Sequence, residues 1–411
     1  MKHIIILGDG MADHAIARLH GKTPLQHADT PNMDLLARNG RTGRLITIPD
    51  GFHPGSEVAN TAILGYDLNK VYEGRGPLEA ASIGYEMRAD DLALRCNIVS
   101  LKDGKIKNHH GGHLTTDEGS VLIKLLDERL GNDNIRFITG TQYRHLLIIR
   151  KGSKHIVCAP PHDHPDEVWK ELMVKPEPEW ENKEEAGRMT ARQTADLINE
   201  LILKSQDILN SPDSLRRQND GQWSIWPWGG GYRPAMRKLC DTYRDIRNGY
   251  VISAVDLIKG IGYYAGLKII KVDGATGLAD TNYEGKAKAA LKALTEGDFV
   301  FLHVEASDEA GHDGDLELKL RTIENFDKRI VGPIYNEVRR WNTNVSIAVL
   351  PDHPTPVEVR THVNEPVPFA IWHPHIMPDD VINFDEASCV AGGYGLLKPD
   401  EFMQVFMDGG E

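Results

Sequence analysis

The chain has 411 residues, of which 40% are hydrophobic and 26% are charged, and its formal net charge at pH 7 is −13. This composition is typical of a globular protein with a sizeable core, and it excludes a disordered, collagenous or coiled-coil chain. The negative charge argues against nucleic acid as the main partner, because that partner needs a basic face to neutralise its phosphates. The length predicts two domains, or one core that carries a large insertion.

The four cysteines, Cys96, Cys158, Cys240 and Cys389, are far apart and form no C-x-x-C pair. Their spacing favours neither a disulfide framework nor a structural zinc site, and it is typical of a protein from a reducing compartment. No apolar run approaches the roughly 20 residues that a membrane-spanning helix needs. The apolar run at residues 4–7 is too short for the core of a signal peptide. We therefore expect a soluble, cytoplasmic protein that binds no membrane.

Strand and helix signals alternate along the first hundred residues. An apolar strand is predicted at residues 4–7, and Thr30-Pro31 before an apolar periodic segment is typical of a helix that begins with proline and ends at Gly40. A second strand is predicted at residues 45–48. A glycine- and proline-rich loop follows it, and the next helix is predicted to begin near Ser56.

The middle of the chain has a different pattern. It contains a predicted helix at 121–130, strand candidates at 135–139 and 145–149, a polar proline and glutamate run at 175–179, a long helix at 191–205 and an aromatic, glycine-rich stretch at 226–231. We interpret the proline and glutamate run as a linker or domain boundary.

The C-terminal part returns to the alternating pattern, with predicted strands at 299–303, 345–350 and 367–372 and a long amphipathic helix at 316–341. Strands that alternate with helices predict a mostly parallel sheet with helices on both faces. We therefore predict an α/β core formed by residues 1–114 and 186–411, with a smaller α+β domain inserted at residues 115–185.

Three segments place candidate metal ligands just past the carboxyl end of a predicted strand, which is the edge where open α/β sheets bind ligands. The ligands are Asp9, Asp308 with His312, and Asp352-His353 with His362 shortly after. Aspartate and histidine are standard ligands of Zn²⁺ and Mn²⁺, and a spacing of four places Asp308 and His312 on one face of a helical turn. A single aspartate after a strand is usually a cap or turn residue, so the metal hypothesis depends on all three segments together.

Ser56 is the candidate nucleophile. It follows glycine and opens an apolar helix, where the exposed N–H groups and the helix dipole stabilise an alkoxide or a phosphate. Taken alone, this position is better explained by an N-cap worth ~1 kcal/mol. A neighbouring pair of metal ions favours the nucleophile, because a metal lowers the pKa of a hydroxyl and two ions ~3.5–4 Å apart can clamp the attacking and leaving oxygens of a phosphoryl transfer.

Over nearly its whole length the chain resembles the archaeal type of cofactor-independent phosphoglycerate mutases, within the alkaline phosphatase superfamily. The resemblance rests on GDGMAD at 8–13, GSEVAN at 55–60, GYD at 65–67, GRGPLEA at 74–80, GATG at 274–277, DEAGHD at 308–313 and PDH at 351–353. It implies an alkaline-phosphatase-like core that holds two divalent ions, and a phosphorylated Ser56. One ion would be held by Asp9, Ser56, Asp352 and His353, and the other by Asp308, His312 and His362.

The mixed carboxylate and imidazole ligands favour Mn²⁺ or Zn²⁺, with Mg²⁺ as a further candidate. The resemblance also implies that the inserted domain closes over a small phosphorylated metabolite. Arg75 and Arg144 are candidate anion clamps, although an ordinary surface charge explains either residue somewhat better.

Two departures from the family pattern affect the substrate. Residues 108–113 read Asn-His-His-Gly-Gly-His where an arginine-rich stretch is typical, so His109, His110 and His113 become the candidate phosphate-binding residues. Glu305 occupies a position where the family usually has a lysine. A carboxylate there would suit a substrate ammonium, as in the subgroup proposed as a homoserine kinase; alternatively, Glu305 pairs with a neighbouring cation.

The main hypothesis is therefore the interconversion of 3-phosphoglycerate and 2-phosphoglycerate through a phosphoserine at Ser56. The alternatives are phosphoryl transfer to homoserine or a similar amino alcohol, a metal-dependent phosphatase in which water takes the phosphoryl group, and a binding protein without turnover. The complete set of ligands argues against the binding protein, and the absence of a G-x-x-x-x-G-K-[ST] loop counts modestly against a kinase. The sequence leaves the oligomeric state open.

Overall fold

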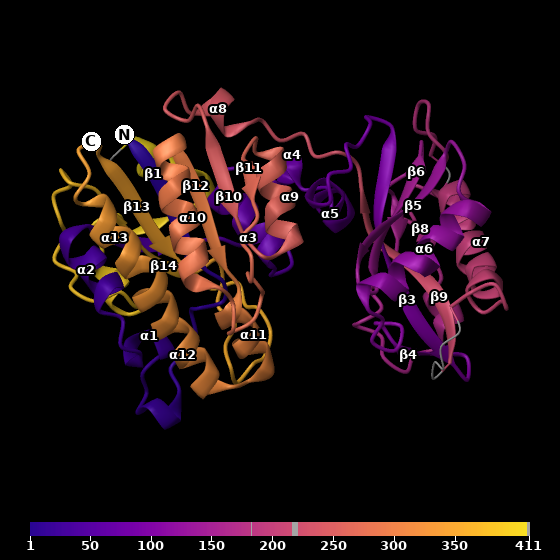
Figure 1. Ribbon diagram of the computed structural model, residues 1–411, viewed down its shortest axis with the longest axis horizontal. Coiled ribbons are helices and arrows are strands. Elements are labelled where there is room, and N and C mark those ends of the chain that lie inside the picture. The colour runs from indigo at the N-terminus through magenta and orange to yellow at the C-terminus, as the bar shows by residue number, and fades with distance from the viewer. Residues whose placement is uncertain (182, 216–220, 409–411) are drawn as a thin grey trace. The chain divides into compact units, whose positions relative to one another are not determined.

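The computed structural model describes residues 1–181, 183–215 and 221–408. The chain divides into two compact units, one formed by Met1–Tyr72 with Ala235–Glu411 and the other by Glu73–Pro234 (Figure 1). The predicted insertion at 115–185 was too narrow. Strands β3 (Asp91–Lys102) and β9 (Gln222–Gly231), which lie outside the predicted range, pair with each other in the second unit.

The first unit is built on an eight-stranded, mostly parallel sheet, as predicted. In spatial order its strands are β11 (Lys268–Ile270), β10 (Gly249–Ile252), β12 (Phe299–Val304), β1 (Lys2–Gly8), β13 (Val345–Leu350), β14 (Val367–Trp372), β2 (Arg41–Leu45) and β15 (Leu396–Leu397). Strands β11 to β13 are parallel, and β14 is antiparallel to both of its neighbours. The central strands β1, β12 and β13 are mostly apolar, which is typical of strands covered on both faces, and each also buries one polar residue: His3, His303 and Ser346.

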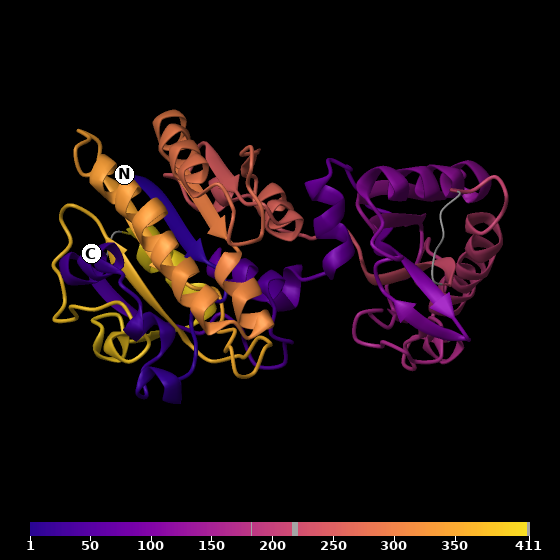
Figure 2. The same cartoon turned by 60° about the horizontal axis from the view of Figure 1, so that its bottom comes forward.

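Helices cover both faces of this sheet (Figure 1, Figure 2). One face packs against α2 (Pro31–Asn39), α10 (Tyr283–Glu296), α12 (Leu316–Phe326) and α13 (Gly332–Val338). The remaining helices of this unit are α1 (Pro24–His27), α3 (Ser56–Ile63), α4 (Leu68–Val71), α8 (Leu239–Thr242), α9 (Asp256–Tyr264), α11 (Ala306–Asp313) and α14 (Pro399–Asp408). On the other face Phe406 of α14 packs edge-on against His3, and Phe402 packs edge-on against Phe369.

Two local predictions differ from the structure. The second strand lies at Arg41–Leu45 and not at 45–48, because it pairs antiparallel with β14 directly after Gly40 ends helix α2. The helix predicted at 316–341 is interrupted by a π-helical turn at Asp327–Val331. The buried Asp327 carboxylate there accepts hydrogen bonds from the backbone N–H groups of Asn32 and Met33 at the start of α2.

The second unit contains an antiparallel sheet in which β3 is central. Its partners are β4 (Lys105–Asn108), β6 (Arg144–Arg150) and β9, and β5 (Ile135–Thr141) pairs with β6. Helices α6 (Thr116–Leu130) and α7 (Ala191–Leu209) pack on this sheet, and the unit also holds α5 (Arg75–Ser82) and the short pair β7 (Ile156–Val157) and β8 (Lys175–Pro176). The unit is thus α+β, as predicted. Among the described residues, no helix is both long and apolar enough to cross a lipid bilayer.

Candidate active site

The candidate ligands meet at one edge of the first sheet. Strands β12, β1 and β13 are adjacent and parallel, and Leu7 of β1 lies opposite both His303 of β12 and Leu350 of β13. The chain segments that follow these strands therefore leave the sheet side by side, and they carry Asp9, Asp308 and Asp352. Residues about 300 positions apart in the sequence are brought together in this way.

Ser56 lies at the start of α3, with Gly55 as the N-cap residue. Its Oγ is 3.1 Å from Nε2 of His353, and Oδ1 of Asp9 is 3.6 Å from the same nitrogen. Asp352 belongs to this group as well, since its Oδ2 lies 3.5 Å from the His353 nitrogen. The Asn60 side chain, one turn along α3, donates a hydrogen bond of 2.9 Å to Asp352 Oδ2 and so joins the serine helix to the metal-ligand loop.

The second predicted set also comes together. Nε2 of His312 is 3.2 Å from Asp308 Oδ2, and Nε2 of His362 is 3.3 Å from Asp308 Oδ1. The two histidine Nε2 atoms are only 2.9 Å apart. The helical spacing predicted for Asp308 and His312 is confirmed, because both lie on α11.

The electrostatics of these groups follow from burial and from their mutual contacts. Burial, followed by the negative charges of nearby carboxylates, raises the pKa of Asp9 well above its ordinary value. Burial alone would also raise the pKa of Asp308, but the hydrogen bonds from His312 and His362 hold it well below the ordinary range. The hydrogen bond with Asp308 raises the pKa of His312 to about 9, whereas burial lowers the pKa of His353.

Two residues next to the ligands hold the loops in place. Gly10 has a φ of +61°, and a Cβ there would lie 2.6 Å from Asp308 Oδ1 and 2.7 Å from Thr355 Oγ1. Only glycine therefore allows this loop to approach Asp308, and its N–H donates to Asp352 Oδ1 at 3.1 Å. The Thr355 hydroxyl donates a hydrogen bond of 2.5 Å to Asp308 Oδ1.

The residues present fit divalent cations. Three overlapping groups have ligand atoms within 4.8 Å of one another, and their members are Asp9, Asp352 and His353; Asp308, His353 and His362; and Asp9, His303 and Glu305. Asp9 Oδ1 is buried and has no hydrogen-bond partner among the described residues. These buried carboxylates and imidazoles form a ligand set that suits Zn²⁺ or Mn²⁺.

Sequence reasoning missed His303, Asn60 and Thr355. His303 was interpreted only as the last residue of a strand, although a histidine in a buried apolar strand just before a ligand loop was an available signal. Asn60 and Thr355 carry no such signal, because a single polar residue near a motif is as common on a helix surface or in a turn as in an active site. Glu305 was assigned to the substrate, but its carboxylate lies beside the buried pair of Asp9 and His303, 3.6 Å from His303 Nε2.

The other predicted substrate residues lie in the second unit, where they form one cationic cluster. Its predicted members are Arg75, Arg144, His109, His110 and His113. His110 stacks on His113 with ring centroids 3.9 Å apart, and both His109 and Arg144 contact the Tyr143 ring. Burial, followed by the positive charge of its neighbours, lowers the pKa of His109.

Arg95 and His162 extend this cluster and were not predicted. The guanidinium of Arg95 lies 5.0 Å from the Trp228 ring centroid and donates a 2.8 Å hydrogen bond to Glu79, which also pairs with Arg75 at 3.1 Å. The His162 ring lies 5.1 Å from the same tryptophan. Trp228 lies within strand β9, and its ring packs against both Arg95 and His162.

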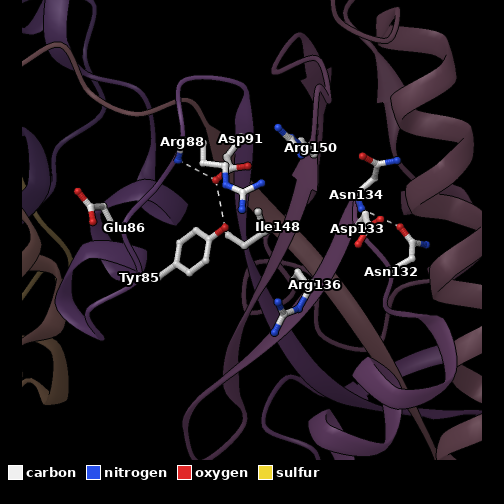
Figure 3. Close-up of a pocket in the computed structure, with 10 residues that line it drawn as sticks. All are labelled: Tyr85, Glu86, Arg88, Asp91, Asn132, Asp133, Asn134, Arg136, Ile148 and Arg150. Carbon is white, nitrogen blue, oxygen red and sulfur yellow. Dashed lines mark hydrogen bonds between the residues drawn. The ribbon is translucent and has the colours of Figure 1, made fainter.

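A separate cavity of about 460 Å³ in the second unit is lined by none of the predicted site residues (Figure 3). Its three arginines, Arg88, Arg136 and Arg150, are matched by the lining carboxylates of Glu86, Asp91 and Asp133. Because these charges offset one another, the cavity lacks the net positive charge that would favour binding of a phosphorylated metabolite.

Comparison with known proteins shows which family this arrangement represents. The model of the 2,3-bisphosphoglycerate-independent phosphoglycerate mutases matches residues 37–213. A mutase of that name from Methanosarcina mazei is 45% identical over 99% of this chain and 100% of its own length. The chain belongs to this mutase family. A more distant relative of the same name, mutase 1 of Methanocaldococcus jannaschii, is 34% identical over 99% of this chain and 97% of its own length.

Solved structures share the fold of this chain. A protein from Pyrococcus horikoshii is 29% identical and covers 99% of this chain and 96% of its own, with a TM-score of 0.81. A cofactor-independent phosphoglycerate mutase from Thermoplasma acidophilum, 24% identical, covers both chains completely with a TM-score of 0.67, which shows that the fold is shared. The curated relatives confirm the resemblance drawn from the motifs.

Proposed function

We propose that the chain interconverts 3-phosphoglycerate and 2-phosphoglycerate by transferring the phosphoryl group to Ser56 and back. The observation that carries this proposal is the position of Ser56 Oγ at the N-terminus of α3, 3.1 Å from His353 and next to the converging carboxylates. The mutase names of relatives that align over 99% of this chain support the same substrate.

The site is proposed to hold two divalent ions, Mn²⁺ or Zn²⁺ with Mg²⁺ as a further candidate. Asp9, Ser56, Asp352 and His353 would hold one, and Asp308, His312 and His362 the other; the separations of 2.9–3.6 Å among their facing atoms support these sets. When bound, such ions lower the pKa of the serine hydroxyl and neutralise the phosphoryl oxygens.

The chain's own residues would act in two steps. Ser56 gives up its proton and its Oγ forms a bond to phosphorus, while the bond from phosphorus to the substrate oxygen breaks and that oxygen takes up a proton. The other glycerate hydroxyl then loses its proton as its oxygen bonds to phosphorus, the bond from phosphorus to Oγ breaks, and Oγ takes up a proton to regenerate the serine. In both steps the N–H groups at the start of α3 face the developing negative charge.

The cationic cluster of the second unit is proposed to bind the anionic groups of the substrate. Arg75, Arg95 and Arg144 can donate to a carboxylate or a phosphate in a two-point geometry. His109 and its neighbours add donors in place of the arginines usual in the family. Pairing of Arg75 and Arg95 with Glu79 fixes both guanidinium groups before substrate arrives.

Phosphoryl transfer to homoserine is not favoured. Its argument rested on Glu305 as a partner for a substrate ammonium, but Oε2 of this carboxylate is buried next to Asp9 and His303. The position of Glu305 supports a role within the metal centre.

A substrate panel tests the proposal. The protein, freed of chelator and supplied with Mn²⁺, is incubated with 3-phosphoglycerate, and separately with homoserine and ATP, and the products are followed by ³¹P NMR. We expect 2-phosphoglycerate without added bisphosphoglycerate and only traces of free phosphate. Phosphohomoserine formation without mutase turnover would contradict the proposal, and stoichiometric release of phosphate would indicate a phosphatase.

A further inference from the structure

Strand β3 turns one face toward the apolar core of the second unit and the other face toward helix α5. Leu94 belongs to the core that α6 and α7 cover, whereas Ala93 packs with Ala80 of α5. Because side chains alternate along a strand, Arg95 and Asn97 lie on the α5 face with Ala93. Both are buried, with 6% and 1% of their surface exposed. A charge and an amide buried at such positions call for a reason beyond stability, since a buried ion pair is often no more stabilising than apolar residues of the same volume.

The neighbouring strands bring further members of the cationic cluster to this face. In the register of the sheet, Arg95 lies opposite Trp228 of β9, and Asn97 lies opposite Arg144 of β6. Residues directly opposite each other on adjacent strands share a face of the sheet. The pairing of three strands therefore places both arginines, the tryptophan and the amide on one surface.

The side-chain amide of Asn97 joins three parts of the cluster. Its Oδ1 accepts hydrogen bonds from Arg95 Nε at 3.1 Å and from Trp228 Nε1 at 3.3 Å. Its Nδ2 donates to the backbone carbonyl of His109 at 3.3 Å. Guanidinium and indole nitrogens can only donate and a carbonyl can only accept, so the amide oxygen must face the two donors and the amide nitrogen must face the carbonyl. The orientation of this amide is thereby fixed by its partners.

Arg95 is held along two of its edges. Its Nε donates to Asn97, and its Nη1 donates to Glu79 Oε1 at 2.8 Å, while the guanidinium lies 5.0 Å from the centroid of the Trp228 ring. Among the described residues, Nη2 has no hydrogen-bond partner. An arginine carries five N–H groups, so these two contacts leave the pair on Nη2 and one on Nη1 for an anion.

We infer that Asn97 is a positioning residue, which orients Arg95 so that the N–H groups on Nη2 bind an anionic group of the substrate. The inference rests on the proposed function, because it names a residue that prepares the anion site of that reaction. Without the amide, Nε of Arg95 is buried and unpaired, which is costly, so the guanidinium turns toward another acceptor. The N–H groups on Nη2 then lose their direction. Asn97 acts through Arg95 and does not itself touch the substrate.

Steady-state kinetics of the full chain test the inference. Asn97→Leu removes the amide but keeps the size of the side chain, and we expect KM for 3-phosphoglycerate to rise roughly tenfold with a smaller change in kcat, as for the loss of one charge-assisted hydrogen bond. Asn199→Leu is the matched control. It removes an amide of α7 in the same unit, whose two polar atoms bond the Val174 backbone at 2.9 Å, and it should leave KM unchanged. An unchanged KM in Asn97→Leu, or an equal rise in Asn199→Leu, would overturn the inference.

A double-mutant cycle separates positioning from a general effect on the fold. Arg95→Gln should raise KM at least as much as Asn97→Leu, and Asn97→Leu/Arg95→Gln should have the KM of Arg95→Gln alone, because the amide acts through the guanidinium. Effects on KM that multiply would show that Asn97 acts independently of Arg95, which overturns the inference. Asn97→Ser covers the case in which circular dichroism shows that the leucine variant does not fold. Its KM should also rise, and an unchanged KM would overturn the inference.

Calorimetry distinguishes this inference from the proposed function. Titration of 3-phosphoglycerate into Ser56→Ala measures binding without turnover, and Ser56→Ala/Asn97→Leu should have a Kd higher by the same factor as KM. Turnover in the wild type, with a Kd that Asn97→Leu does not change, refutes the inference alone. Weaker binding caused by Asn97→Leu, with no mutase turnover in the wild type, refutes the proposed function alone.

Discussion

Lys319 is fully buried on α12, and its replacement should show how strongly the loops around the candidate active site depend on one internal charge pair. Its Nζ donates to Asp13 Oδ2 at 2.8 Å, to the carbonyl of Thr355 at 2.8 Å and to the carbonyl of Ala12 at 3.2 Å. The lysine thus ties the loop after β1, which carries Asp9, to the loop after β13, which carries Asp352. Asp13 Oδ2 also accepts from the N–H of Val357 at 3.1 Å.

Lys319→Met retains the length of the side chain but leaves the Asp13 carboxylate buried without its counter-ion. Breaking a buried pair by removing one partner costs about 3–5 kcal/mol, and the two carbonyls also lose a donor. Since a domain is stable by only about 5–15 kcal/mol, this loss is large. Lys319→Met/Asp13→Asn should recover most of it, because the neutral amide keeps an acceptor for the Val357 N–H.

Guanidinium denaturation followed by circular dichroism measures the free energy of unfolding, with the transitions of the two units fitted separately. Lys328→Met, at an exposed position shortly after α12, is the matched control and should change stability by less than about 0.5 kcal/mol. A loss below about 1 kcal/mol in Lys319→Met, or a double variant as unstable as the single one, would refute this account of the buried pair.

Three further predictions concern turnover, substrate binding and pH. Ser56→Ala should lose turnover by orders of magnitude. Intact-mass measurement after incubation with phosphoglycerate should find an added phosphoryl group in the wild type but not in the variant. An active alanine variant would exclude the phosphoserine route. Arg144→Gln should raise KM for 3-phosphoglycerate roughly tenfold with a smaller change in kcat, because a charge-assisted hydrogen bond contributes about 1.5–3 kcal/mol. An unchanged KM would show that Arg144 does not bind the substrate. Burial raises the pKa of Glu386 from its ordinary value of 4.5 to about 7. Between these two pH values the folded protein keeps a proton that the unfolded chain has released. The stability linked to this proton is therefore present below pH 4.5 and is lost as the pH rises through 7. The melting temperature of the wild type should therefore fall between pH 5 and pH 8 relative to that of Glu386→Gln, and parallel profiles would argue against this titration.

The elements that position the site could be predicted from the sequence because their signals are local. Short, mostly apolar runs such as residues 4–7 and 345–350 indicate a buried strand, and the polar residues directly after such a strand leave the sheet at its carboxyl edge. Asp308 and His312 are four residues apart, about one helical turn, so a helix places them on the same face. The motifs also identify the family, because seven segments that match it in the same order along the chain are far more specific than any single match.

Only the tertiary structure decided which distant residues share an environment. Sheet order places β1 between β12 and β13, so that His303 and Glu305 lie beside Asp9. The observed boundaries of the second unit differ from the predicted ones for the same reason. Local propensity predicts that a segment is extended, but the pairing of β3 with β9, across more than a hundred residues, depends on which complementary edge the folded chain brings alongside. The fine structure of the site is therefore a property of packing between distant segments, which no local pattern of residues encodes.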